Sequence, residues 1–394
     1  MEFGATITRA VTRCGEYRDT ACETAPIQPE SWIVRRTVRI LAIDGGGVRG
    51  LLPARLLVEL EAMAGRPLRS LFDVVAGTSV GGIMALGYAA PGADGKGFTA
   101  ADVFEDLRSW LPDIFPPLQA AASIDGLRDA HERHALSQLV GAALLPHHFG
   151  NARYSARALE EHVAGAFGDA RLRDLLTDVA VPAYDMRSGQ PVVFRSREAR
   201  TSNAERANPR LTEVARATSA APTYLPPLRL IDDDDESVLI DGGVVANNPA
   251  AIAYLDGLES GRDEDGAAPD VVLLSVGTGR PSAQQPSYEE IFTRNWASLG
   301  MGLLGVVLNG VGEMAHQLVD RMVSDKPEPN LYLRVQPTLT HGVSLHIDDA
   351  TPANLDALVR CAEATVEERR SELERLVALL TAPTPIPPQP AGTR

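Results

Sequence analysis

The segment of residues 38–90 limits the fold more than any other, because it alternates apolar runs with glycine-rich turns. VRILAID leads through GGGVRG into the helical pattern LLPARLLVELEAMAG, and FDVVAG leads directly into SVGGIMALGYAA. Continuous apolar runs of this length are typical of strands buried on both faces, which occur in parallel sheets covered by helices. We therefore expect an α/β fold of three layers, α/β/α, with a mostly parallel central sheet that begins with this β-α-β-α unit.

The rest of the chain continues the alternation. Strands are expected at DVAVPAYDM, PVVFRS, SVLID, VVLLSVG and LYLRVQ, and helices near residues 102–110, 154–166, 247–259, 302–324 and 353–380. The acidic run at 232–236 lacks the alternating ligands of a calcium loop and is expected at the exposed end of a hairpin. We divide the chain into an N-terminal extension (1–35), one α/β domain (36–345), a helical segment packed on the core (346–381) and a proline-rich, disordered tail (382–394).

The charge balance and the cysteines exclude several classes of function. Acidic residues outnumber basic ones, 52 to 37, and a formal charge of −15 repels the phosphate backbone of nucleic acids. The three cysteines suit a reducing compartment, and neither they nor the histidine pairs at 131/134 and 147/148 show metal-ligand spacing. Residues 1–30 contain no apolar core of a secretory signal. We expect a cytoplasmic protein without metal, cofactor or nucleic-acid partner; the sequence sets no oligomeric state.

The most apolar stretch is WASLGMGLLGVVLNGVG, residues 296–312, which is interrupted by five glycines. It is too short and too rich in glycine for a membrane span. We interpret it as a buried or interfacial helix, the latter acting as a flap that touches a lipid surface transiently.

GTSVG, residues 77–81, fits the nucleophile-elbow pattern G-x-S-x-G. This chemistry needs a serine hydroxyl on a sharp turn between a strand and a helix, and Gly77 and Gly81 allow the turn without steric clash. The expected strand before Ser79 and helix after it supply the required context. An ordinary serine in a glycine turn is the alternative, and the strand–turn–helix context makes the elbow the better interpretation.

DGGGVRG, residues 44–50, ends the first strand and leaves uncovered backbone N–H groups that can point at a developing oxyanion. It is not a phosphate-binding loop of the P-loop type, because no G-K-[ST] follows. Arg49 would strengthen an anion site or bind a lipid phosphate; a structural salt bridge that holds the loop is the alternative.

DGGVVANNP, residues 241–249, follows the expected strand SVLID. Asp241 would lie at the carboxyl edge of the sheet, where α/β proteins place catalytic groups. Taken alone, the block favours the alternative, a turn aspartate that caps the helix expected at 247–259.

Together these blocks resemble the patatin-like phospholipase family. DGGGVRG resembles its oxyanion loop, GTSVGG its elbow, ATSAAPTYLPP (217–227) its third block, and DGG the block of its dyad aspartate. VVLLSVGTG, NLYLRVQP and IDDATPANL are similar to its later parts, so that the likeness runs from about residue 38 to about residue 362. Val80 stands where many members have threonine, which matters little because this residue offers its backbone N–H.

The resemblance implies a lipid acyl hydrolase of the phospholipase A type, with a patatin-like fold. Ser79 would be the nucleophile, Asp241 its base, and the substrate a phospholipid or another acyl lipid. The backbone N–H groups of Gly45, Gly46, Gly47 and Val80 would form the oxyanion hole. Asp44, Arg49, Gly50, Gly77, Gly81, Gly242 and Gly243 would support these groups.

Three alternatives stay open at this point. A Ser/Asp/His triad would use Ser79, Asp241 and one of His316, His341 and His346. The same acyl-enzyme could pass its acyl group to an acceptor other than water, or the fold could serve as a binding module without activity. A carboxylate base also predicts activity below pH 6.5, where an imidazole would be protonated.

Overall fold

The computed structural model describes the chain in nine segments, and all structural statements concern these residues. They are 36–92, 95, 97–116, 152–202, 204–232, 235–262, 266–281, 296–340 and 342–383. The expected N-terminal extension, nearly all of the proline-rich tail and the histidine pairs at 131/134 and 147/148 lie outside the described residues.

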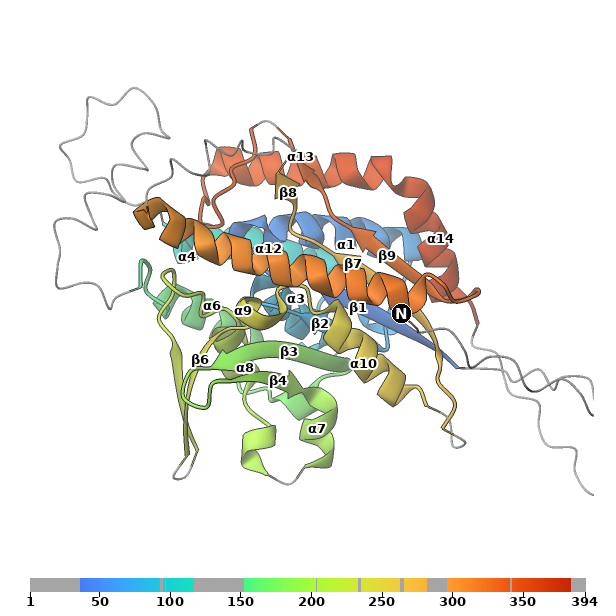
Figure 1. Cartoon of the computed structure of the whole chain (residues 1–394), viewed down its shortest axis with the longest axis horizontal. Helices are drawn as coiled ribbons and strands as arrows, with labels where there is room; N and C mark the ends of the chain where they lie inside the picture. Colours follow the sequence, from blue (N-terminus) through green and yellow to red (C-terminus); the bar gives the residue numbers. More distant parts are fainter. Residues whose placement is uncertain are drawn as a thin grey trace, which may run out of the picture. The chain divides into compact units, whose positions relative to one another are not determined.

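An eight-stranded sheet forms the centre (Figure 1) in the order β5-β6-β3-β2-β1-β7-β9, with β4 also paired to β3. The strands from β3 to β9 in this order are parallel, whereas β4 and β6 run antiparallel to β3, and β5 antiparallel to β6. The strands are β1 Thr37–Ile43, β2 Val74–Gly77, β3 Asp178–Asp185, β4 Gln190–Arg195, β5 Leu228–Asp232, β6 Asp235–Asp241, β7 Asp270–Val276 and β9 Leu331–Val335, and the short β8 Arg280–Pro281 pairs with β10 Thr338–Leu339. The expected mostly parallel sheet is confirmed.

Both faces of the sheet are covered because strand side chains alternate between them. In β1, Leu41 and Ile43 pack on one face, and Ile40 and Ala42 on the other. The first face carries α1, α3, α4, α6, α8, α13 and α14, and the second carries α10 and α12. The helices are α1 Leu51–Ala64, α2 Leu68–Leu71, α3 Val80–Ala89, α4 Ala100–Ile114, α6 Arg157–Phe167, α7 Ser196–Thr201, α8 Leu211–Thr218, α9 Gly243–Ala246, α10 Ala250–Ser260, α12 Trp296–Val323, α13 Pro352–Glu368 and α14 Arg370–Thr381. This is the expected three-layer α/β/α arrangement.

Two helical segments differ from the expectation. α12, Trp296–Val323, joins into one helix the two segments that were expected separately, the apolar helix at 296–312 and the helix near 302–324. The segment expected as one helix at 353–380 is two helices, α13 and α14, that meet at Arg369. None of the helices in the described part of the chain combines the length and hydropathy that a bilayer span requires.

Candidate active site

Ser79 lies in the sharp turn that joins β2 to α3. Its backbone has φ 56° and ψ −125°, a conformation that residues with a side chain rarely adopt. A Cβ on Gly77 would lie 2.0 Å from the carbonyl oxygen of Gly81, and a Cβ on Gly81 would lie 2.4 Å from that of Ile43. Both glycines of the elbow pattern are therefore needed where the chain turns back on itself.

Asp241 lies at the same height in the sheet as Ser79, although the strand that carries it runs in the opposite direction. β6 runs antiparallel to β3, and Asp241 pairs with Ala183. Ala76 of β2 pairs with Ala180 of β3, so three residues further along both strands Ser79 is level with Ala183. The sequence analysis expected Asp241 at the end of its strand and at the carboxyl edge of the sheet; it is the last residue of β6, which pairs antiparallel with β3.

The Asp241 carboxyl is buried and makes few polar contacts. Burial raises its pKa to about 6, and hydrogen bonds from the Gly243 N–H and the Ser79 side chain offset only part of this rise. The Gly243 nitrogen lies 2.7 Å from Oδ1 of Asp241. Gly242 turns the chain after the strand, where a Cβ would lie 2.2 Å from the carbonyl oxygen of Pro182. The DGG sequence thus shapes the surroundings of the carboxyl.

Of the four amides expected to form the oxyanion hole, those of Gly46 and Gly47 in the glycine loop and of Val80 in the elbow are free within the described residues, and that of Gly45 is not. The N–H of Gly45 donates to the carbonyl oxygen of Asn247 at 3.0 Å, so it has no proton left for an oxyanion. Gly46, Gly47 and Val80 line the cavity beside Ser79. Within the described residues their N–H groups donate to no other atom. The four-donor expectation is corrected to these three.

The loop is held from behind by residues far away in sequence. The Thr278 hydroxyl donates to the carbonyl oxygen of Gly45 at 2.8 Å, and the Val48 N–H donates to that of Ile347 at 2.8 Å. A Cβ on Gly47 would lie 2.2 Å from the Ile347 oxygen, and a Cβ on Gly50 would lie 2.6 Å from Cγ2 of Val80. Only glycine fits at these two close approaches.

Asp44 anchors the start of the loop through a buried ion pair. Both guanidinium Nη atoms of Arg334 contact its carboxylate, at 2.7 and 2.5 Å. Nη1 of Arg334 also donates to the Ser275 hydroxyl at 2.8 Å. Arg334 lies on β9 and reaches across β7 to the end of β1, a link between edge and centre of the sheet that no sequence spacing indicates.

Two threonines that the sequence analysis did not single out fix the elbow. The Thr218 hydroxyl accepts a hydrogen bond from the Ser79 N–H at 2.9 Å and donates to the carbonyl oxygen of Pro182 at 2.7 Å. The Thr78 hydroxyl donates to the carbonyl oxygen of Ala246 at 2.6 Å. Thr218 belongs to the block at 217–227, which was the one signal that could have pointed to it.

Among the described residues Arg49 has no partner for the salt bridge that was one of its two interpretations. Its Nε is buried and has no hydrogen-bond partner among the described residues, and none of the ion pairs between them involves it. Burial lowers the pKa of its guanidinium, and the nearby Tyr224 opposes this change. Arg153, paired with Asp348 at 2.6 Å, lies over the same Tyr224 ring at 5.3 Å from its centroid. Two guanidinium groups, those of Arg49 and Arg153, therefore lie near Tyr224.

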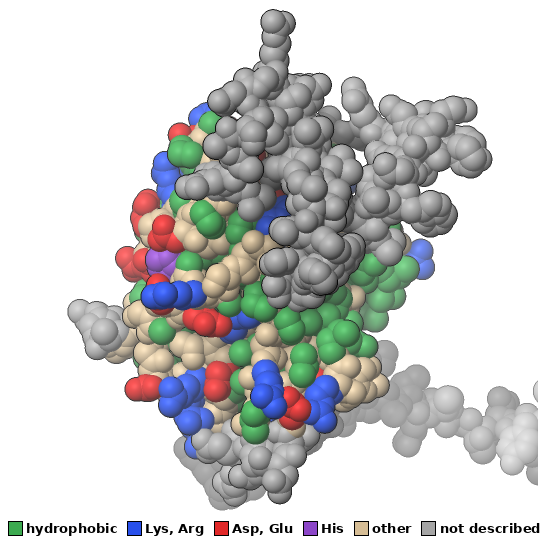
Figure 2. Space-filling view, turned by 90° about the vertical axis from the view of Figure 1, so that its left-hand side faces the viewer, with side chains coloured by type: hydrophobic (Ala, Val, Ile, Leu, Met, Phe, Trp, Pro, Cys, Tyr) green, Lys and Arg blue, Asp and Glu red, His purple; other side chains and the backbone are tan. Residues whose placement is uncertain are grey.

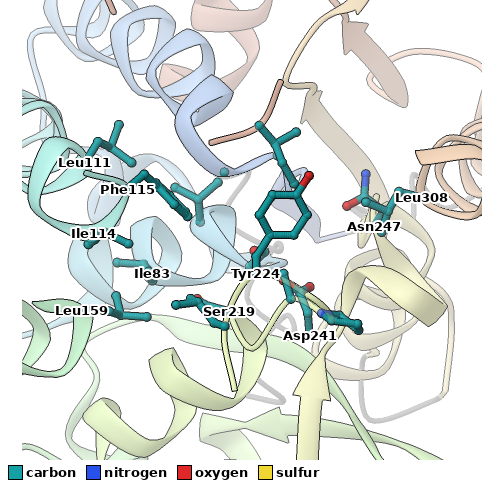
Figure 3. Close-up of a pocket in the computed structure, with 18 of the residues that line it drawn as sticks. Ile83, Leu111, Ile114, Phe115, Leu159, Ser219, Tyr224, Asp241, Asn247 and Leu308 are labelled. Carbon is teal, nitrogen blue, oxygen red and sulfur yellow. The ribbon is translucent and has the colours of Figure 1, made fainter. Parts of the chain in front are cut away.

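A cavity of about 60 Å³ opens beside Ser79 and Asp241. Figure 3 shows its apolar side, with Ile83, Leu111, Ile114, Phe115 and Leu159, across from Asp241 and Asn247. The described residues that line it include no histidine. His316 instead contacts the Tyr332 hydroxyl at 3.0 Å, and His341 lies outside the described residues.

α12 contributes to both the cavity and the surface. Leu308 lines the cavity, whereas Val306, Met314, Leu318 and Met322 are exposed. Met314, Leu318 and Met322 are spaced by four residues, which places them along one side of the helix, whereas Val306 lies farther round it. Figure 2 views the side of the molecule on which α4 and α6 lie and shows hydrophobic side chains gathered on part of this face. In the segment 296–312 the described side chains are those of 305–312, and the exposed Val306 and Val307 among them argue against a fully buried helix.

Comparisons with known proteins agree with these observations. Residues 41–254 match the family described as "Patatin-like phospholipase". Patatin-like protein 2 of Arabidopsis thaliana is 32% identical over 380 residues, 87% of this chain and 86% of the relative. Patatin-like protein 1 of Oryza sativa subsp. indica is 31% identical over 85% of this chain and 83% of the relative. The crystal structure of VipD from Legionella pneumophila is 11% identical at a TM-score of 0.33 and covers 83% of this chain and 67% of that one, a likeness too low to support any argument.

The chain therefore belongs to the patatin-like phospholipase family. The resemblance inferred from the sequence is confirmed. Members of this family are lipid acyl hydrolases, which places the protein among the carboxylic ester hydrolases.

Proposed function

We propose that the protein cleaves fatty acyl esters of phospholipids, as a phospholipase of the A type, through a dyad of Ser79 and Asp241. The observation that carries the proposal is that Ser79 and the buried carboxyl of Asp241 line the same cavity, whose described lining has no histidine. A triad would need an imidazole beside Asp241. The Gly243 N–H donates to this carboxyl instead, and the nearby Ser79 side chain lowers its pKa.

In the proposed reaction Asp241 accepts the Ser79 proton while Oγ attacks the ester carbonyl. A carboxyl with a pKa of about 6 is ionised at neutral pH and is a stronger base than an ordinary aspartate. The N–H groups of Gly46, Gly47 and Val80 stabilise the oxyanion. The proton moves to the departing alcohol, and water, activated by the same carboxylate, then releases the fatty acid from Ser79.

A phospholipid is the proposed substrate because of the cation near Tyr224. Arg49 carries a charge that no described carboxylate neutralises, in a chain of net charge −15. A buried guanidinium gains most from an anionic partner such as a phosphate, with which it forms two parallel hydrogen bonds. Arg49→Gln is expected to lower hydrolysis of phospholipids while sparing uncharged short-chain esters.

We also propose that the exposed apolar side of α12 touches the lipid surface from which the substrate enters. Leu308 of this helix lines the cavity, so the contact would lie next to the entrance. Local apolar contact is compatible with the acidic chain, because it does not require anionic lipid. A cytoplasmic location remains part of the proposal.

The test is to incubate the pure protein with mixed phospholipid vesicles and to measure fatty acids and lysophospholipids by mass spectrometry. The expected result is release of both, together with labelling of Ser79 by a fluorophosphonate probe. Labelling of another serine with Ser79 unmodified would contradict the proposal. Repeating the incubation with an added alcohol distinguishes hydrolysis from acyl transfer, since transfer would yield a new ester in place of free fatty acid.

A further inference from the structure

A second apolar cavity lies next to the first. It has a volume of about 20 Å³ and shares Ile83, Leu107 and Trp110 with the cavity of about 60 Å³ beside Ser79. The remaining residues of its lining are Gly87, Phe98, Val103, Asp106, Ala166 and Phe167. The three shared side chains therefore separate two spaces that lie between the same helices.

The two cavities follow one another along α3, α4 and α6. On α3, Ile83 lies at the division and Gly87, one turn further, lines the second cavity. On α6, Leu159 lines the first cavity and Ala166 the second, seven residues or about 10 Å along the helix. α4 runs in the opposite direction, because its later residues Leu111 and Ile114 line the first cavity and the earlier Val103 lines the second. The path leads away from Ser79 along all three helices.

Small residues leave the space in the second cavity. Gly87 has no side chain, and a Cβ there would already lie 3.1 Å from Cγ2 of Val103. Ala166 faces it from α6 and is partly exposed. Asp106, also partly exposed, is the one charged residue in the described lining. A space that is apolar except at one edge suits the end of a hydrocarbon chain.

Ile83, Leu107 and Trp110 form the division between the two cavities. Trp110 is held in place by polar and ring contacts, whereas Leu107 is not. Trp110 stacks on His162 at 5.2 Å with an angle of 13° between the rings, and His162 contacts Asp113 at 3.0 Å. These contacts hold the indole in place. Leu107 is almost fully buried and is held by apolar contacts alone, so its side chain is the part of the division that can be removed with least effect on its neighbours.

We propose that the acyl chain of the substrate runs from Ser79 between α3, α4 and α6, and that Ile83, Leu107 and Trp110 set the chain length by closing the first cavity. This rests on the proposed hydrolysis of acyl esters at Ser79. Chains that end before the division are preferred, and longer chains are excluded from the second cavity until the division is opened. The three residues thus determine specificity without taking part in the chemistry.

The test measures kcat/KM for p-nitrophenyl esters from butyrate to palmitate with wild type, Leu107→Ala, and Leu107→Ala combined with Ala166→Leu. Opening the division should raise the palmitate-to-octanoate ratio about tenfold, since two more buried methylene groups are worth about that factor. Refilling the second cavity with Ala166→Leu should return the ratio toward that of the wild type. Leu56→Ala, a buried leucine of α1 that lines neither cavity, controls for lost stability and should keep the wild-type ratio.

An active Leu107→Ala protein with an unchanged ratio would overturn the proposal and leave the proposed function standing. If neither the wild type nor any variant hydrolyses an ester, the proposed function fails. The path of the acyl chain between α3, α4 and α6 is then tested by binding alone. Isothermal titration of octanoic and palmitic acid into Ser79→Ala, with and without Leu107→Ala, then gives the same comparison. No gain in palmitate affinity on opening the division would rule this path out.

Discussion

The two sides of the Ser79 cavity are held together by different forces. The side formed by strand ends and loops depends on single hydrogen bonds between distant residues, such as Ser79 N–H to Thr218 and Gly45 N–H to Asn247. The side formed by α3, α4 and α6 depends on packing of apolar side chains. Removing one partner of a buried hydrogen bond costs the full desolvation of the other, whereas apolar packing tolerates changes of similar volume. We therefore expect the polar side to be sensitive to single atoms and the apolar side to volume.

The largest contrast is expected between the dyad and an apolar residue of the same cavity. Ser79→Ala and Asp241→Asn should each lower kcat/KM by about a thousandfold or more, because neither variant can move the proton. Ile114→Val removes one methyl group from the opposite side and should change it only a few-fold. The measurement is kcat/KM for a soluble ester, with folding checked by circular dichroism.

The histidine triad is tested in the same assay. Each of the eight histidines is substituted singly and compared with Asp241→Asn. If a folded histidine variant loses as much activity as Asp241→Asn, the base is an imidazole and the dyad is wrong.

A smaller effect is expected at Thr218, which holds the Ser79 backbone. Thr218→Val keeps the shape of the side chain but leaves the Ser79 N–H without its acceptor. An unsatisfied buried donor costs about 1–3 kcal/mol, which would lower kcat about ten- to a hundredfold. Thr218→Ser keeps the hydroxyl and should restore most of the rate. Equal rates for the valine and serine variants would show that the hydroxyl does not position the nucleophile.

The pH dependence of activity should follow the Asp241 carboxyl. Its pKa is raised to about 6, and the base must be ionised, so kcat/KM should fall as the pH falls through about 6. The pH range below 6.5 in which activity is expected becomes narrow, because burial brings the pKa of the carboxyl close to that of an imidazole. Adding dioxane separates the two: a less polar solvent disfavours the charged form, so the acid limb should move to higher pH for a carboxyl and to lower pH for an imidazole.

The smallest effect is expected on the outer surface of α12. The Leu304 side chain, where the sequence alone would place a test charge, lies outside those described, but Val306 is 66% exposed. Val306→Asp should lower activity on vesicles a few-fold and leave a soluble ester unaffected. Leu255→Asp, at a side chain 61% exposed on α10, is the matched control and should change neither rate. Equal loss on both substrates would indicate that the helix only packs.

The sequence predicted the elements whose residues carry their own signal. β2 and α3 consist of apolar residues and glycine, and β1 is apolar except for Thr37 and Arg39, so their burial is visible in the composition of each run. α8 escaped prediction because four of its eight residues are polar or charged, including an Arg216 that is buried against Glu160. β5 escaped because it is a short hairpin strand at the edge of the sheet. The expected hairpin at the acidic run is present as the β5–β6 pair.

In the site, sequence motifs identified the residues of glycine-rich turns. They missed the residues that hold these turns in place through hydrogen bonds from distant parts of the chain. The elbow and the glycine loop follow from residues within a few positions of each other. Thr218 lies 139 residues from Ser79, and Asn247 and Gly45 are 202 apart, so no local spacing connects them. Whether a glycine amide is free or already bonded, as at Gly45, depends on a carbonyl that only the fold brings near.

The contact between Gly47 and Ile347 joins residues 300 positions apart and has a consequence for how the protein is made. Translation proceeds from the N-terminus, so the elbow and the glycine loop leave the ribosome while most of the chain is still unmade. The carbonyl that receives the Val48 N–H is made 299 residues after Val48 itself. Until then a nascent chain carries Ser79 while the glycine loop lacks one of the contacts that fix it. Under the proposed function, chains released before that point would carry the nucleophile and still hydrolyse esters poorly.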